Sequence, residues 1–122
     1  MHKTINNLNI IENLLKIKVG IIPNIIAVSK TFPANDVLPL VNYGHIHFGE
    51  NKVQESIDKW TDIKLNNDIK LHLVGKLQTN KVKLAIKIFD YIHSLDSEKL
   101  AKKIADEQIK QNKNIKIFIQ IN

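Results

Sequence analysis

Short apolar runs alternate with longer amphipathic segments along almost the whole chain, and this alternation limits the fold more than any other feature. The runs are too short for helices, are rich in β-branched residues and are bounded by turn-forming residues, as expected of buried strands. Repeated β-α units require parallel strands joined by helical crossovers. We therefore predict an α/β fold with a parallel sheet. Its strands are expected at residues 25–28, 46–48, 71–74, 91–93 and 115–121.

Five helices are expected around these strands. The first is an amphipathic N-terminal helix over about residues 5–15, and the others cover 35–43, 50–60 and 78–89 and a segment that Asp96 or Ser97 caps and that ends near Gln111. In this last helix we expect Leu100, Ile104 and Ile109 to face the core. The polar stretch 61–70 predicts a loop, and Gly49 is expected to close the second strand.

Pro39 conflicts with the second helix, because a proline inside a helix costs about 3 kcal/mol. The conflict disappears if Asp36 is the N-cap. Pro39 then lies in the first turn, where its missing N–H is not needed. Gly44 is the expected stop of this helix.

Two architectures fit this pattern: an open doubly wound sheet, or part of a (β/α)8 barrel. A complete barrel needs about 250 residues, and the 122 residues of this chain could supply roughly the first half. The strands at both ends of such a half would lack a neighbour, which favours association or aggregation.

The composition argues against several classes of function. There is no cysteine, which excludes disulfides and thiolate metal sites and fits a cytoplasmic protein. No apolar run approaches the roughly 18 residues of a membrane span. The net charge of +6 comes from lysine alone and is scattered along the chain. Without arginine, which reads guanine and clamps phosphate as a bidentate fork, nucleic-acid binding is disfavoured.

The C-terminal ends of parallel strands collect functional groups in both architectures, and this rule selects a few residues. Lys30 directly follows an apolar strand. Partial desolvation would lower the pKa of its amine and free it as a nucleophile toward aldehydes, although a lysine that simply reaches solvent has the same pattern. Asn51 opens a helix, where capping is its ordinary role, and His72 lies within a strand, where a core histidine is the ordinary role.

Other familiar chemistry finds no support in the sequence. His45 and His47 form a His-x-His pair, but no third ligand stands at a familiar spacing, so we expect no metal site. Glycine-rich phosphate loops of the GxGxxG or GxxxxGK type and the Gly-x-Ser-x-Gly motif are absent. We therefore expect no catalytic triad.

Taken together, four ordered segments resemble those of the pyridoxal phosphate homeostasis proteins (the YggS/PROSC family). They are residues 27–31 (AVSKT), 48–55 (FGENKVQE), 72–81 (HLVGKLQTNK) and 119–122 (IQIN). Their order and spacing are those of the family, and the resemblance covers the chain from about Ile25 to its end.

The resemblance implies a barrel similar to the N-terminal domain of alanine racemase, with residues 1–122 as a single, incomplete domain. It implies that Lys30 holds pyridoxal 5'-phosphate as a lysine aldimine, that Asn51 lies beside the cofactor, and that His72 and Gly75 lie near the pocket. Such proteins bind and hand over the cofactor in vitamin B6 homeostasis and are not regarded as enzymes. The expected partner is the cofactor itself.

The family is about twice as long as this chain. We therefore expect a truncated or inactive form, or a chain that self-associates or pairs with a separate C-terminal half carrying the groups that hold the cofactor's phosphate. Two alternatives remain open: a fragment of a racemase-like pyridoxal phosphate enzyme, and a basic interaction module without a cofactor.

Overall fold

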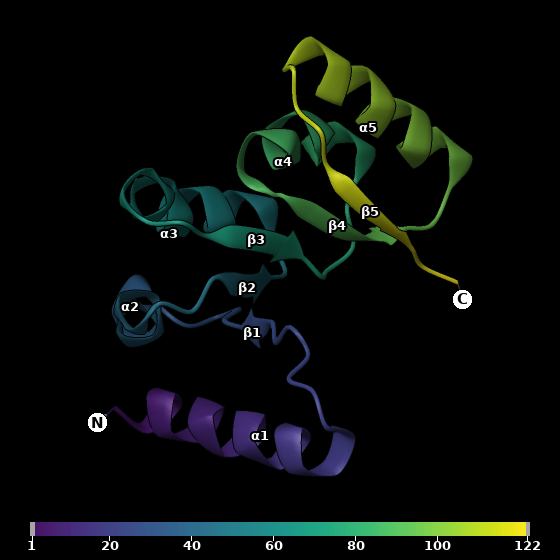
Figure 1. The fold of residues 1–122 in the computed structure, drawn as a ribbon. Coiled ribbons are helices and arrows are strands. Elements are labelled where there is room, and N and C mark those ends of the chain that lie inside the picture. The colour runs from purple at the N-terminus through teal and green to yellow at the C-terminus, as the bar shows by residue number, and fades with distance from the viewer. Residues whose placement is uncertain (1, 122) are drawn as a thin grey trace.

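The computed structural model describes residues 2–121 as one parallel sheet with a helix between each pair of consecutive strands (Figure 1). The predicted strands and helices are confirmed, with shifted ends. In chain order the elements are α1 (Lys3–Val19), β1 (Ala27–Val28), α2 (Ala34–Tyr43), β2 (His47–Glu50), α3 (Val53–Asn66), β3 (Lys70–Leu73), the 3₁₀ helix η1 (Thr79–Lys81), α4 (Val82–Ile88), β4 (Tyr91–Leu95), α5 (Glu98–Lys110) and β5 (Lys116–Ile119).

The strands lie side by side in sequence order, β1-β2-β3-β4-β5, and every pairing is parallel. A doubly wound sheet reverses its strand order at a switch point, and this sheet has no reversal. Sequential order is instead the arrangement of a (β/α) barrel. The sheet is not closed, because β1 and β5 are its edges. The fold is therefore part of a barrel, as predicted.

The core fills the space between the helices and one face of the sheet. Phe48, Leu71, Leu73 and Ile92 alternate along their strands with residues of the other face, and all four are fully buried. The Phe48 ring lies 4.8 Å from the ring of Trp60 on α3, which identifies this face as the helix-covered one. The opposite face is more open.

One row of residues crosses that open face. The strand register aligns Val28 with Gly49, Gly49 with His72, His72 with Tyr91, and Tyr91 with Lys116. At the β1 end of this row, the Val28 side chain is 51% exposed.

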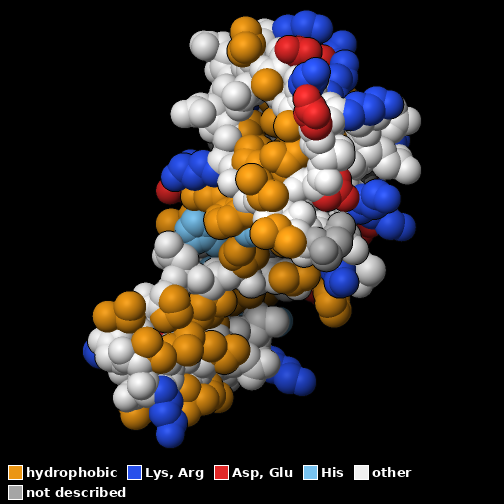
Figure 2. Space-filling view, turned by 90° about the vertical axis from the view of Figure 1, so that its right-hand side faces the viewer, with side chains coloured by type: hydrophobic (Ala, Val, Ile, Leu, Met, Phe, Trp, Pro, Cys, Tyr) orange, Lys and Arg blue, Asp and Glu red, His pale blue; other side chains and the backbone are white. Residues whose placement is uncertain are grey.

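Helix α1 lies beyond the β1 edge (Figure 1) and buries little of its apolar surface. Leu8 is buried, and Tyr43 of α2 donates a hydrogen bond to Asn9. Ile10, Leu14 and Ile17 point to solvent. Figure 2 shows hydrophobic side chains gathered at the lower end of the molecule, where α1 lies. No helix in the described part of the chain is both long and apolar enough to cross a bilayer.

Two expectations about helix boundaries are wrong. Pro33, not Asp36, is the N-cap of α2, so Pro39 lies inside the helix and past its first turn. The Asp36 N–H bonds to the Pro33 carbonyl, which closes the first turn without a side-chain cap. The stretch 61–70 is a loop only over residues 67–69. Helix α3 continues to Asn66, because Ile63 packs against the core.

Two further expectations concern burial and strand ends. Ile109 is 77% exposed rather than inward, because Glu107 occupies the buried position one turn after Ile104. Gly49 does not close β2, which continues through Glu50. This extra residue matters, since it places the Glu50 carboxylate on the buried face. Gly44, in contrast, ends α2 as expected, with φ at 105°.

The two isoleucines of α5 provide a test of this packing. We expect Ile104→Ala to lower the free energy of unfolding by about 2–4 kcal/mol, because it leaves a cavity in the core. Ile109→Ala, on the exposed side of the same helix, should change it by less than about 0.5 kcal/mol. Urea unfolding followed by circular dichroism measures both. Equal losses would contradict the observed orientation of α5.

Candidate functional site

Three of the four residues singled out from the sequence follow strand ends at the same edge of the sheet. Lys30 comes two residues after Val28, and Asn51 comes two residues after Gly49, the partner of Val28 in the register. Gly75 follows β3, the next strand. Because the strands are parallel, these residues share the C-terminal edge, where barrels carry their sites.

Gly75 and Asn51 are in close contact. A Cβ atom built on Gly75 would overlap the backbone oxygen of Asn51 and would lie 2.8 Å from its Oδ1 atom. Any larger residue at position 75 would therefore displace Asn51. The glycine allows the amide side chain of Asn51 to remain beside the end of β3.

His72 lies deeper, within β3, and is bound on both sides. His47 Nδ1 and His72 Nε2 are 2.9 Å apart, and His72 Nδ1 and His93 Nε2 are 2.8 Å apart. The ring of Tyr91 stacks on His72 at 4.1 Å. We call these three histidines the histidine ladder. Since both ring nitrogens of His72 are already engaged, the arrangement favours a supporting role for His72 over direct polar contact with a ligand.

His72 is buried at the centre of the histidine ladder, between the half-buried His47 and His93, and this affects the protonation of the ladder. Burial, with smaller contributions from the neighbouring His93 and His47, lowers the pKa of His72 from 6.5 to about 4. Burial likewise lowers the pKa values of His47 and His93. At neutral pH the ladder is uncharged. Each N–H donates to the next ring nitrogen, which is the protonation state that neutral imidazoles require.

The expected pair of His45 and His47 does not act as a unit. His45 packs edge-on against Phe48, whereas His47 belongs to the ladder. Within residues 2–121, no group of His, Asp and Glu side chains is arranged to hold a metal ion.

Lys30 lies in a tight turn that begins at Ser29. The Phe32 N–H donates to the Ser29 carbonyl at 3.2 Å, so Lys30 and Thr31 are the central residues. Thr31 has a φ of 68°, a left-handed conformation that is rare for a β-branched residue. Positive φ at this position is typical of a type II turn. The side chain of Lys30 is exposed, so the expected partial desolvation of its amine is wrong.

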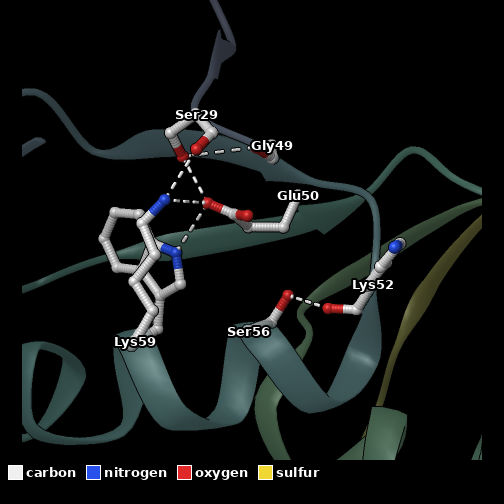
Figure 3. A network of polar contacts seen from close by, with 7 residues as sticks. Ser29, Gly49, Glu50, Lys52, Ser56 and Lys59 are labelled. Atoms are coloured by element: carbon white, nitrogen blue, oxygen red, sulfur yellow. Dashed lines mark hydrogen bonds and ion pairs between the residues drawn. The ribbon is translucent and has the colours of Figure 1, made fainter. Parts of the chain in front are cut away.

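A buried polar network fixes the residue just before Lys30 (Figure 3). Its centre is Oε2 of Glu50, which accepts hydrogen bonds from Ser29 Oγ at 2.5 Å, Lys59 Nζ at 2.8 Å and Trp60 Nε1 at 3.0 Å. Lys59 also donates to the Ser29 carbonyl at 2.6 Å. We call these four residues the Glu50 network. It ties the end of β1 to β2 and α3.

Sequence reasoning missed the Glu50 network, because it assigned Glu50 to the start of a helix. The alternation in residues 48–50 was the available signal: Phe48 and Glu50 lie on the same face of a strand. Only the fold shows that α3 then brings Lys59 and Trp60 to that carboxylate.

A lysine-rich hollow adjoins this edge. A cavity of about 370 Å³ is lined by residues that include Asn51, Lys52, Lys76, Gln78 and Lys81. The residues at the edge thus offer a primary amine, an amide and positive charge. This donor set suits a small anionic aldehyde.

Comparison with known proteins identifies relatives of the chain. It is 35% identical over 101 residues to the pyridoxal phosphate homeostasis protein of Vibrio alginolyticus and 37% identical over 98 residues to that of Buchnera aphidicola. Each match covers 80% of this chain and 43% of the relative. The resemblance stated from the sequence motifs is therefore confirmed. The chain spans less than half the length of these curated relatives, and no family model matches it.

Solved structures agree with these relatives. PipY of Synechococcus elongatus with PLP bound superposes with a TM-score of 0.78 at 37% identity, over 91% of this chain and 53% of PipY. PipY without PLP gives a TM-score of 0.75 at 40% identity and covers 80% of this chain. The fold of this chain thus matches about half of PipY.

The histidine ladder predicts a pH-dependent stability. The unfolded chain takes up a proton at His72 near pH 6.5, whereas the folded chain resists it until about pH 4. The free energy of unfolding should therefore fall as the pH drops through this window, by at most about 3 kcal/mol from His72. Urea unfolding of the wild type and His72→Asn at a series of pH values between 4 and 7.5 measures this. A similar loss in both proteins would contradict the assignment.

Proposed function

We propose that this chain binds pyridoxal 5'-phosphate through Lys30 and serves intracellular cofactor homeostasis by holding the reactive aldehyde, not by transforming a substrate. The cofactor supplies an aldehyde that condenses with a primary amine, releasing water. The chain supplies this amine from Lys30, just after the end of β1. The preceding residue, Ser29, is held by hydrogen bonds at its N–H, its hydroxyl and its carbonyl.

The observation that carries the proposal is the arrangement at the C-terminal edge of the sheet. Lys30, Asn51 and Gly75 follow the ends of three neighbouring strands, and Gly75 is in close contact with Asn51. The chain is also similar to PipY, one structure of which has PLP bound. In our proposal Asn51 borders the cofactor and Gly75 keeps Asn51 in place. His72 supports the sheet beneath the pocket through the histidine ladder.

The proposal extends to the organisation of the molecule. We infer that residues 1–122 act as a single domain, an incomplete cofactor-binding barrel. Its unpaired edges, β1 and β5, favour self-association or pairing with a separate C-terminal half. A cytoplasmic location is part of the proposal and is supported by the absence of cysteine.

Both alternatives lead to other expectations. A racemase-like enzyme needs a second catalytic base facing the bound amine, and exchange of the α-proton of an amino acid would reveal it. A basic interaction module needs no amine at position 30. Salt-sensitive nucleic-acid binding that survives Lys30→Ala would favour that reading.

Covalent trapping tests the proposed function. We expect wild-type protein incubated with pyridoxal 5'-phosphate and reduced with borohydride to carry the label at Lys30, as peptide mapping by mass spectrometry shows. Lys30→Ala should lose that label. Lys110→Ala, which removes an exposed lysine at the end of α5, away from the C-terminal edge of the sheet, is the matched control and should keep it.

Labelling spread evenly over the lysines of the wild type would overturn the proposal. The same wild-type sample, passed over a size-exclusion column with light scattering, tests the inferred association. A stable monomer at all concentrations would contradict that part alone.

A further inference from the structure

We propose that Glu50 and Lys59 are positioning residues for Lys30, which hold its backbone at the strand end through Ser29. The inference rests on the proposed function of Lys30 and extends it to residues that never touch the cofactor. It is derived from the contacts of the Glu50 network, which lies on the helix-covered face of the sheet.

All polar groups of Ser29 are held. Its N–H donates to the Gly49 carbonyl at 2.9 Å, its hydroxyl donates to Glu50, and its carbonyl accepts from Lys59 and from Phe32. Ser29 itself is only 5% exposed. The backbone of Ser29 therefore fixes the position of the next Cα atom, that of Lys30. The exposed side chain of Lys30 can still change its rotamer.

Stability alone does not explain why the two charged side chains of this network are buried. Glu50 is 1% exposed and the Lys59 side chain 6%, so both charges are largely withdrawn from water. Buried ion pairs often stabilise no more than apolar residues of the same size would. What this pair does provide is geometry. One carboxylate oxygen joins β1, β2 and α3 at the residue before the reactive amine.

A second lysine of α3 makes a similar connection away from the site. Lys64 donates to the Ile88 carbonyl and to the carboxylate of Asp90, each at 2.7 Å. Like Lys59, it combines one carbonyl and one carboxylate acceptor. Its partners lie at the end of α4 and just before β4. This is the edge of the sheet where the strands begin, opposite to the C-terminal edge that carries Lys30. Lys64 is therefore the matched control for Lys59.

A fixed strand end favours the condensation because it reduces the freedom that the amine must lose when it reacts. Without the network, the turn carrying Lys30 and the left-handed Thr31 is free to relax. The amine would then spend less time where the aldehyde is held. The expected effect is on the binding equilibrium at Lys30, and the fold as a whole should persist.

The test compares Glu50→Gln, Lys59→Met and Lys64→Met in the full chain. We expect the equilibrium constant for adduct formation at Lys30, measured from the absorbance of the bound cofactor, to fall about tenfold in the first two variants, or ~1.4 kcal/mol. Lys64→Met should change it less than about twofold. Thermal unfolding of each variant reports the structural cost separately.

A second measurement uses an aldehyde that lacks the cofactor's phosphate group. Pyridoxal, which has the aldehyde alone, is trapped with borohydride, and the share of label on Lys30 relative to the other lysines is counted by peptide mapping. We expect this share to fall in Glu50→Gln and Lys59→Met and to stay at the wild-type level in Lys64→Met. Lys59→Arg, which keeps the charge and the donors, should restore it.

The outcomes separate the two claims. If the wild type carries no selective label at Lys30, the proposed function fails and this inference with it. If the wild type is labelled and the folded variants are labelled equally well, only the positioning role is overturned. Losses that follow thermal stability across all three variants, Lys64→Met included, also overturn it. If Lys59→Met does not fold, Ser29→Ala takes its place, because it removes a single hydroxyl of the network. Unchanged labelling of Lys30 in Ser29→Ala would also overturn the positioning role.

Discussion

A single carboxylate oxygen connects the elements on which the candidate site depends. Oε2 of Glu50 accepts from a serine on one strand end and from a lysine and a tryptophan on α3. A buried carboxylate is costly unless its lone pairs are satisfied, and here three donors converge on one atom. The contact fixes how α3 lies against the first two strands. Through Ser29 it also fixes where the chain leaves the sheet toward Lys30.

The two faces of the sheet play different roles. The helix-covered face contains the apolar core and the Glu50 network, which together hold the strand ends in place. The open face carries the histidine ladder, whose neutral rings join β2, β3 and β4 by hydrogen bonds across the strands. Both edges of the sheet are unpaired. The molecule therefore combines a firmly built C-terminal edge, which carries the candidate residues, with an open face and two edges that have no neighbouring strand.

Much of this arrangement could be predicted from the sequence, because it depends on local patterns. Alternating apolar runs gave the order of strands and helices, and the rule about strand ends selected Lys30 and Asn51, whereas Gly75 came from the family resemblance. The sequential strand order could not be predicted without the family resemblance, since a doubly wound sheet has the same local pattern. The buried position of Glu50 was missed for a physical reason. Acidic residues are favoured in the first turn of a helix, and only tertiary contacts with α3 show that Glu50 ends a strand instead.

The central claim is that the Glu50 carboxylate holds the end of β1, and amide hydrogen exchange at Ser29 tests it most directly. The Ser29 N–H bonds to Gly49, and the Lys70 N–H makes a bond of the same 2.9 Å length to Ile46, near the other end of β2. Exchange reports the opening of such bonds one by one. The account predicts that Glu50→Gln speeds exchange at Ser29 and leaves Lys70 almost unchanged. Equal acceleration at both amides, or none at Ser29, would contradict it.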